Sequence, residues 1–384
     1  MSSRPSLVVD HDPDEGYSLP GWLYHDPEFY RHEMTRIIRP SWQIVCHVSD
    51  LPVVGSWHTL EYLGESIVVV RGDNGDIAAF TNVCRHRGSR LVDGSSGCAK
   101  KLVCPYHAWV YELDGRLSGV PARASYTVPL PAGLVPVEHE TWQGFVFVRL
   151  ESGGPSVAAM MAPHEAEVAP YRFADMQPLK SVTERPRAVN WKNLCDNYSD
   201  GLHVPVAHPG LRRLFGDGYH IEAGAHADRL GGKLRDLARG SWSERAYQKL
   251  RPRAEHLDDA AQSLWLYFKL WPNIAFDIYP DSVDFMQFLP TGPTTTSLRE
   301  SAYALPDPRR EMRAARYLNA RINRDVNAED NVLVNRVQAG MASSSYTAGP
   351  LGEGEVCLRS FARKLRAAIP EARLPKAPAP GWSN

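Results

Sequence analysis

Hydrophobic residues in the first 150 positions recur in short alternating runs separated by turn sequences, a pattern typical of β-strands. These runs are Trp42–His47, Gly55–Tyr62, Ile67–Arg71, Ile77–Phe80, Tyr106–Leu113 and Trp142–Leu150. Asp73-Asn74-Gly75-Asp76 is a hairpin signal within the series. Ahead of it, Asp26-Pro27 begins a short helix that Pro40 ends. We therefore predict a small antiparallel β-domain at residues 41–150.

The pattern changes after Ser152-Gly153-Gly154-Pro155, which we interpret as a domain boundary. Strands are predicted at Ser181–Val189, Leu264–Leu270, Ile274–Tyr279, Val283–Leu289 and Thr294–Ala304. Helices are predicted at Val157–Glu167, from Asn190 onward, from about Asp307 to Met341, and at Glu353–Ala368. Residues 211–254 lack a clear period and predict a flexible cover over a site. The fold class is α+β, with residues 1–40 and 151–384 forming a second domain.

Length, charge and cysteine content narrow the functional classes. The chain has 384 residues, enough for two or three domains, and its net charge of −1 disfavours nucleic acid and anionic membranes as partners. No apolar run approaches ~18 residues, so we expect no transmembrane helix, and Met1–Tyr17 lacks the apolar core of a signal peptide. The six cysteines show no pairing pattern, which indicates a reducing cytoplasm.

One candidate metal site lies between Asn190 and Pro209. His203 and His208 stand close together, and two neutral imidazoles with one carboxylate would make the facial triad of a non-heme Fe(II) oxygenase. Five residues span about 500° of α-helix, so both rings can reach one metal only if Pro205 breaks the helix between them. Asp200 precedes His203 by three residues, on the same face of a helix.

The third ligand is expected on the long helix predicted from about Asp307 to Met341. Its apolar stripe consists of Ile322, Val326, Leu333 and Val337. Glu329 and Asp330 both fall within this stripe, where an unpaired carboxylate is costly. Asp325 and Asn327 are nearby alternatives, and periodicity alone does not choose between Glu329 and Asp330.

A second candidate metal site lies earlier in the chain. Cys84-Arg85-His86 is followed by Cys104-Pro105-Tyr106-His107, so each of two segments offers one thiolate and one imidazole. Two cysteines and two histidines can bind zinc or a Rieske [2Fe–2S] cluster. Zinc motifs usually pair cysteine with cysteine and histidine with histidine, so this arrangement favours the Rieske cluster, with both cysteines on one iron and both histidines on the other.

The two motifs together resemble the α subunits of Rieske non-heme iron oxygenases. The matching residues are Cys84, His86, Cys104, His107, Asn197, Asp200, His203 and His208. The resemblance implies a Rieske domain at 41–150 and a helix-grip (START-like) catalytic domain formed by the rest. It also selects Asp330 as the third ligand of a mononuclear Fe(II) and makes Asp200 the bridge between the iron site and a cluster histidine. It puts Asn197 near the iron, with an ordinary helix-capping or turn role as the alternative for this residue.

The resemblance further implies the terminal oxygenase component of a monooxygenase or dioxygenase. Electrons would come from NAD(P)H through a separate flavin/iron–sulfur reductase, with or without a ferredoxin, and O₂ would oxidise a small organic substrate. In this family the cluster and the iron of one chain lie far apart, which implies a homotrimer with transfer between subunits. Two other classes stay open, namely a Rieske electron carrier without catalysis and a zinc-stabilised interaction protein.

The substrate is predicted from single-subunit members of the family that the chain resembles. Many of these hydroxylate a methyl group on nitrogen or oxygen, and choline- and betaine-type quaternary amines are prominent among their substrates. Aromatic residues that could cage an ammonium group by cation–π attraction are concentrated in the predicted strands. They are Trp265, Tyr267, Phe268, Trp271, Phe276, Tyr279, Phe285 and Phe288. We therefore expect oxidative N-demethylation of a betaine-like amine, with hydroxylation or O-demethylation of an aromatic acid as the alternative. Packing of these rings in the core is the competing interpretation.

Overall fold

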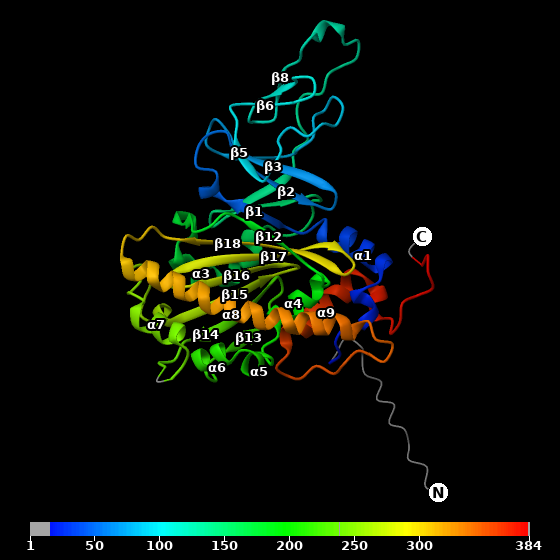
Figure 1. Ribbon diagram of the computed structural model, residues 1–384. Coiled ribbons are helices and arrows are strands. Elements are labelled where there is room, and N and C mark those ends of the chain that lie inside the picture. Colours follow the sequence, from blue (N-terminus) through cyan, green and yellow to red (C-terminus); the bar gives the residue numbers. More distant parts are fainter. Residues whose placement is uncertain (1–15, 238, 383–384) are drawn as a thin grey trace.

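The computed structural model describes residues 16–237 and 239–382, which form a narrow β-rich lobe standing on a larger α+β lobe (Figure 1). Two predictions concern residues 1–15, namely that they contain no signal peptide and that they belong to the second domain. These residues lie outside the described part of the chain. Among the helices that are described, none combines the length and the apolar character that a membrane span requires.

Three small antiparallel sheets make up the narrow lobe. Its strands are β1 (Gln43–His47), β2 (Ser56–Tyr62), β3 (Glu65–Arg71), β4 (Ile77–Thr81), β5 (Ser96–Cys98), β6 (Leu102–Val103), β7 (Val110–Tyr111), β8 (Leu117–Gly119), β9 (Glu138–Trp142) and β10 (Phe145–Arg149). The sheets have the orders β1-β10-β9, β4-β3-β2-β5 and β6-β7-β8. Most of the predicted strands are therefore confirmed to within a few residues.

Two of the predicted strands are wrong in extent. The segment predicted as one strand from Trp142 to Leu150 is half of a hairpin, because Gln143 and Gly144 adopt φ of 47° and 84° and reverse the chain between β9 and β10. Tyr106–Leu113 contains only the short β7, because the residues before it form a loop in which Ala108 N donates to Cys104 O at 3.0 Å.

The large lobe contains an eight-stranded antiparallel sheet with the order β11-β18-β17-β16-β15-β14-β13, in which β12 also pairs with β18. Its strands are β11 (Gln177–Pro178), β12 (Thr183–Arg187), β13 (His220–Glu222), β14 (Ala227–Lys233), β15 (Leu264–Leu270), β16 (Ile274–Tyr279), β17 (Ser282–Gly292) and β18 (Thr295–Ala304). The four strands from β15 to β18 lie where the sequence predicts them.

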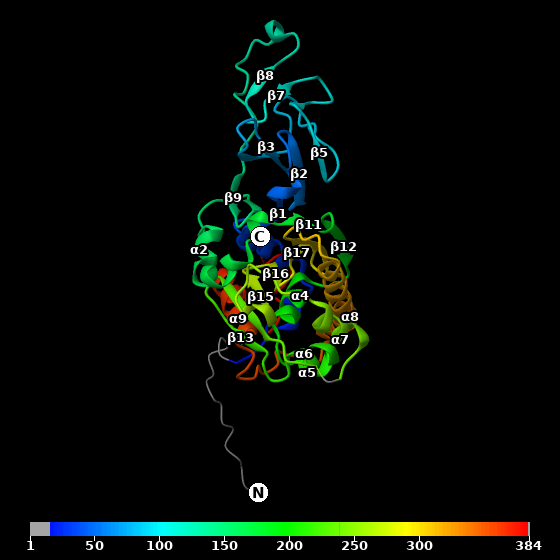
Figure 2. The same ribbon diagram turned by 90° about the vertical axis from the view of Figure 1, so that its left-hand side faces the viewer.

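Helices cover both faces of this sheet. They are α1 (Pro27–Glu33), α2 (Val157–Met161), α3 (Glu165–Val168), α4 (Trp191–Ser199), α5 (Val204–Ala207), α6 (Pro209–Phe215), α7 (Trp242–Leu250), α8 (Arg310–Met341) and α9 (Val356–Ala368). In Figure 2, α7 and α8 lie on one side of the sheet and α2 and α9 on the other. The predicted long and C-terminal helices are confirmed as α8 and α9.

The prediction of a flexible cover at residues 211–254 is wrong. This segment contributes most of α6, strands β13 and β14 of the main sheet, and α7. Its glycines hid the strand pattern: Gly231 and Gly232 lie inside β14, and a side chain at either would collide with backbone, at Trp265 O and Gly218 O respectively. Close backbone approach, rather than mobility, therefore explains its composition.

Candidate functional site

The first motif lies on two adjacent loops of the narrow lobe, residues 84–89 and 104–109, which we call the cluster loops. Each loop is closed by a hydrogen bond from the cysteine N–H, to Ser89 O and to Trp109 O, both at 2.8 Å. Cys84 and Cys104 are 2% exposed, and the rings of His86 and His107 lie with their centroids 4.6 Å apart. The structure thus brings all four predicted ligand residues together on loops of the narrow lobe.

The polar atoms of the cluster loops fit a [2Fe–2S] group. The Nδ1 atoms of His86 and His107 are buried and have no hydrogen-bond partner among the residues that the structure describes, which is costly unless a ligand occupies that position. Burial disfavours the thiolate of Cys104, but N–H groups of Tyr106 and His107 hydrogen-bond its sulfur and hold its pKa below the usual value. The donor set of two thiolates and two imidazoles is the one that a Rieske cluster needs.

The second motif is assembled in the large lobe from two distant parts of the chain. One ligand atom each from His203, His208 and Asp330 lies within 4.8 Å of the others, and we call these residues the triad. The two Nε2 atoms are 3.1 Å apart, and Asp330 Oδ1 lies 3.0 Å from that of His208 and 3.5 Å from that of His203. Within the described part of the chain, Asp330 Oδ1 is buried and has no hydrogen-bond partner. Two imidazoles and one carboxylate that converge in this way fit a divalent iron.

A double break in the chain allows the two histidines to converge. Helix α4 ends at Ser199, His203 precedes the single turn of α5, and His208 separates α5 from α6. The predicted break near Pro205 is therefore present, but it lies on both sides of α5, and Pro205 itself is inside this short helix. The prediction that Asp200 and His203 share a helical face is wrong, because Asp200 caps α4 in extended conformation. Its Oδ2 nevertheless lies 3.1 Å from Nδ1 of His203.

The two candidate carboxylates of α8 face different atoms. Asp330 faces the Nε2 atoms, whereas Glu329 Oε2 lies 2.8 Å from Nδ1 of His208, on the far side of that ring. Asp330 belongs to the row Ile322, Val326, Asp330 and Val334, in steps of four residues, in which Ile322 and Val334 are buried. The predicted stripe was inaccurate here, since Val337 is 45% exposed.

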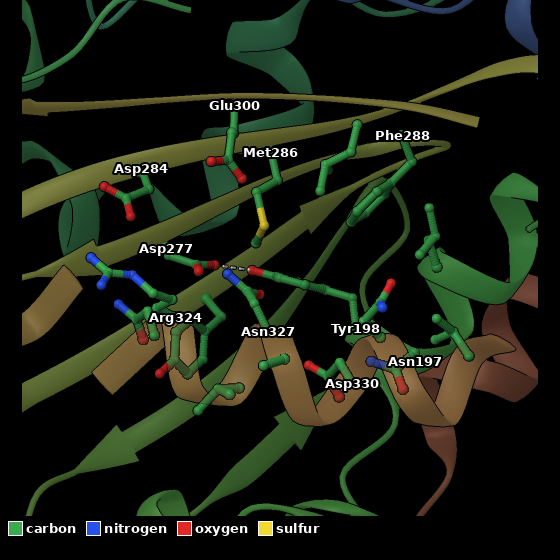
Figure 3. A pocket seen from close by; sticks show the side chains of 18 of the residues that line it. Asn197, Tyr198, Asp277, Asp284, Met286, Phe288, Glu300, Arg324, Asn327 and Asp330 are labelled. Atoms are coloured by element: carbon green, nitrogen blue, oxygen red, sulfur yellow. Dashed lines mark hydrogen bonds between the residues drawn. The ribbon is translucent and has the colours of Figure 1, made fainter. Parts of the chain in front are cut away.

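The triad opens into a cavity of about 640 Å³ between the sheet and α8 (Figure 3). Asn197 and Asn327 line it, whereas Asp325 does not. Burial opposes ionisation of Asp330, but its interactions with His203 and His208, together with a smaller one with Asn197, outweigh burial and hold its pKa low.

The sheet wall of the cavity carries a row of side chains that face the same way across three strands. Tyr267 of β15 pairs with Asp277 of β16, which pairs with Asp284 of β17. Further along β17, Met286 and Phe288 share this face by the two-residue period and also line the cavity. The row therefore combines aromatic and acidic groups opposite α8.

The predicted aromatic wall is only partly present. Tyr267, Phe285 and Phe288 line the cavity. Trp265, Phe268, Trp271, Phe276 and Tyr279 do not line it and instead pack in the hydrophobic core. Sequence reasoning missed Tyr198 and Tyr219, which come from outside these strands, and the carboxylates of Asp277 and Asp284. A charged residue in the middle of an apolar strand was the available signal, because it marks the face that is not core.

Comparison with known proteins agrees with this geometry. A model of the ring-hydroxylating α subunit (catalytic domain) family matches residues 162–371, and a model of the Rieske [2Fe–2S] domain matches residues 41–137. The chain belongs to the ring-hydroxylating α-subunit family. This membership makes it the oxygenase component of a Rieske non-heme iron oxygenase, with a Rieske cluster and a mononuclear iron as cofactors and electrons from NAD(P)H through a reductase. The zinc protein and the non-catalytic electron carrier are thereby excluded.

Individual relatives match between half and nine-tenths of the chain. The carnitine monooxygenase oxygenase subunit of Escherichia coli (strain K12) is 30% identical over 353 residues, which are 90% of this chain and 88% of the relative. The glycine betaine monooxygenase oxygenase subunit of Chromohalobacter salexigens is 39% identical over 196 residues, 51% of this chain and 44% of the relative. The fold matches the quaternary ammonium Rieske monooxygenase CntA in complex with L-carnitine, with a TM-score of 0.75, 24% identity and coverage of 94% and 97%.

Proposed function

We propose that this oxygenase subunit oxidatively demethylates a small quaternary amine. The observation that carries the proposal is the cavity itself, which opens on the triad and whose sheet wall combines Tyr267 with the carboxylates of Asp277 and Asp284. Each aromatic face attracts an ammonium ion by about 0.5–2 kcal/mol. The carboxylates attract the same positive charge. Relatives named for carnitine and glycine betaine oxidation support the same substrate class.

In this proposal the triad binds the mononuclear Fe(II), and Cys84, His86, Cys104 and His107 bind the cluster. When bound, the iron supplies the site at which O₂ is activated for attack on the substrate. Glu329 and Asp200 hold the outer Nδ1 atoms of His208 and His203, which sets the orientation of both rings. Asn197 lies beside Asp330 and limits the freedom of its carboxylate.

The residues of the cavity wall bind and orient the amine. Tyr198 OH donates to Asp277 at 2.6 Å, which keeps the phenol ring across the cavity next to Phe288, at a centroid distance of 6.2 Å. Val204, Leu211 and Val326 line the cavity with apolar surface, which excludes water from around the triad. A methyl group on nitrogen needs only such apolar contact, whereas the charge needs the aromatic and acidic wall.

We further propose that the working unit is a homotrimer in which electrons pass between subunits. The cluster loops adjoin β6 and β7 in the narrow lobe, whereas the triad lies in the large lobe between α5 and α8 (Figure 1), so a direct path within the chain is long. Asp200 is the proposed bridge from His203 to a cluster histidine of the neighbouring subunit. A flavin/iron–sulfur reductase, with or without a ferredoxin, would deliver the electrons. The six free cysteines favour the cytoplasm as the location.

Turnover with a surrogate reductase tests the proposed reaction. Glycine betaine, proline betaine and carnitine are compared with benzoate and methoxybenzoates, and formaldehyde release is measured against NAD(P)H consumption. We expect equal amounts of formaldehyde and oxidised NAD(P)H with at least one quaternary amine. Tight coupling with the aromatic acids alone would contradict the amine proposal and favour aromatic hydroxylation or O-demethylation instead.

A further inference from the structure

Four basic residues line the cavity, and none of them has an acid of its own among the described residues. They are Lys180, Arg185, Arg187 and Arg324. Lys180 and Arg185 share a single acid, Glu300, at 3.0 and 3.1 Å. Arg187 donates to the neutral amide of Asn331 at 3.3 Å. The positive charge on this part of the cavity lining is therefore only partly neutralised within the protein.

Arg324 has the least support of the four. Its side chain forms no hydrogen bond or ion pair with any other residue that the structure describes. Arg324, Asn327 and Asp330 follow one another in steps of three along α8, and all three line the cavity. Figure 3 shows Arg324 toward the side of the cavity where Asp284 lies and Asp330 toward the other side. Because six residues of helix rise by about 9 Å, Arg324 offers an anion partner to the far end of a small molecule at the triad.

The acid on the same side of the cavity leaves Arg324 available near neutral pH. Burial, with the charge of Asp277 in addition, raises the pKa of Asp284 to about 8, so most of this acid is protonated at pH 7. Burial raises the pKa of Asp277 to about 7, so this acid is about half ionised and still attracts an ammonium group. The other charged groups that act on Asp284 are Glu300 and Asp281, which raise its pKa, and Lys180, which lowers it.

We propose that Arg324 binds the carboxylate of a zwitterionic substrate, whose ammonium group lies at the aromatic and acidic wall with a methyl group toward the triad. A guanidinium can donate two parallel hydrogen bonds to one carboxylate, which adds direction to the attraction. This inference rests on the proposed function and deepens it, because it narrows the small quaternary amine to one that also carries a carboxylate. Arg324 is then a residue that determines specificity and takes no part in the oxidation itself.

Calorimetric titration of the holoenzyme, without reductase or O₂, tests Arg324 with two matched pairs of ligands, glycine betaine and carnitine, each against its amide. The amide keeps the quaternary ammonium group and nearly the same shape but has no negative charge. We expect the carboxylate form of at least one pair to bind about tenfold more tightly than its amide at pH 7, the size of one charge-assisted contact. Arg324→Gln should remove this preference by weakening the carboxylate form alone, and Arg324→Lys should retain part of it.

Two further variants locate the effect. Arg321→Gln removes an exposed cation of α8 that does not line the cavity, and it should leave the preference unchanged. Asp284→Asn tests the competition between the two acids for Arg324. As the pH rises above about 8, Asp284 ionises in the wild type and competes with the substrate carboxylate, so the preference should decline there. In Asp284→Asn the preference should persist.

The outcomes separate the role of Arg324 from the function. Equal affinity within both pairs in the wild type, or a preference that persists in Arg324→Gln, would overturn the inference while leaving amine oxidation in place. Loss of the preference in Arg187→Gln alone would assign the carboxylate to Arg187 instead. Equal weakening of carboxylate and amide in Arg324→Gln would show a structural role and also overturn it. Failure of all four ligands to bind, together with absence of formaldehyde from every quaternary amine, would contradict the proposed function.

Discussion

The cluster loops draw all four of their ligand residues from positions 84–107, whereas the triad joins His203 and His208 to a residue of α8 more than a hundred positions later. In the loops, short hydrogen-bonded turns orient the side chains, and only small strands support them. At the triad, the three ligand residues converge only if the helix break, the long helix and the sheet behind them pack together correctly. A local metal site is therefore readable from residue spacing, while an assembled site depends on packing that spacing does not contain.

The largest effect should come from the residue on which the assembled site depends most. Asp330→Ala removes the only carboxylate of the triad, and we expect loss of the mononuclear iron, retention of the cluster and turnover below detection. Iron and acid-labile sulfide analysis, with the EPR signal of the reduced cluster, measures both sites in one sample. Asp325→Ala is the matched control on α8. A variant that retained the mononuclear iron would show that Asp330 is not its ligand.

The link between the two sites is tested by Asp200→Asn. The amide preserves the shape of the side chain beside His203 but removes the charge that supports transfer, so both metals should stay bound while turnover falls about 10–100-fold. Stopped-flow oxidation of the prereduced cluster by O₂ and substrate measures this step directly. Cluster oxidation at the wild-type rate would rule out the bridging role.

A smaller effect is expected from Glu329→Gln. Because Glu329 orients His208 through Nδ1 and does not face the centre of the triad, the variant should bind iron about tenfold more weakly and still turn over when iron is in excess. Iron affinity is measured by competition with a chelator. If Glu329→Gln lost iron as completely as Asp330→Ala, the two carboxylates would have the reverse roles.

The last effect is on stability rather than on the metal sites and concerns the joint between the two lobes. His47 of β1 is fully buried, its Nε2 donates to Phe173 O at 3.0 Å, and burial lowers its pKa to about 4. The unfolded chain therefore binds a proton below about pH 6.5 that the folded chain does not, so acid reduces stability. We expect a loss of about 2 kcal/mol between about pH 8 and about pH 5.

Denaturant unfolding of the wild type and of His47→Gln at both pH values measures this contribution. Glutamine does not titrate, so the variant should lose less stability on acidification, whatever its stability at pH 8. An identical loss in the two proteins would show that His47 contributes no pH dependence.

The same contrast explains how far the sequence predicted the fold and the site. Strands β15 to β18 and helix α8 were predictable because long apolar runs and a helical period are local signals. The residues of the cavity wall were not predictable. Alternation in β16 puts Phe276 and Asp277 on opposite faces of the sheet, but it does not tell which of the two faces meets α8. Asp330 could be chosen over Glu329 only by knowing which face of α8 is buried. That face contains Val334 and not Val337. Residues 211–254 were misread because glycines in β14 serve close backbone contact, which has no periodic signature.

The most direct test of the account is a single turnover of the prereduced holoenzyme with O₂ and glycine betaine amide or glycine betaine, in the absence of any reductase. The account predicts formaldehyde in proportion to the cluster that is oxidised, because the cluster loops and the triad act together on an amine in the cavity. Oxidation of the cluster with no formaldehyde from any quaternary amine, but with product from a methoxybenzoate, would contradict it.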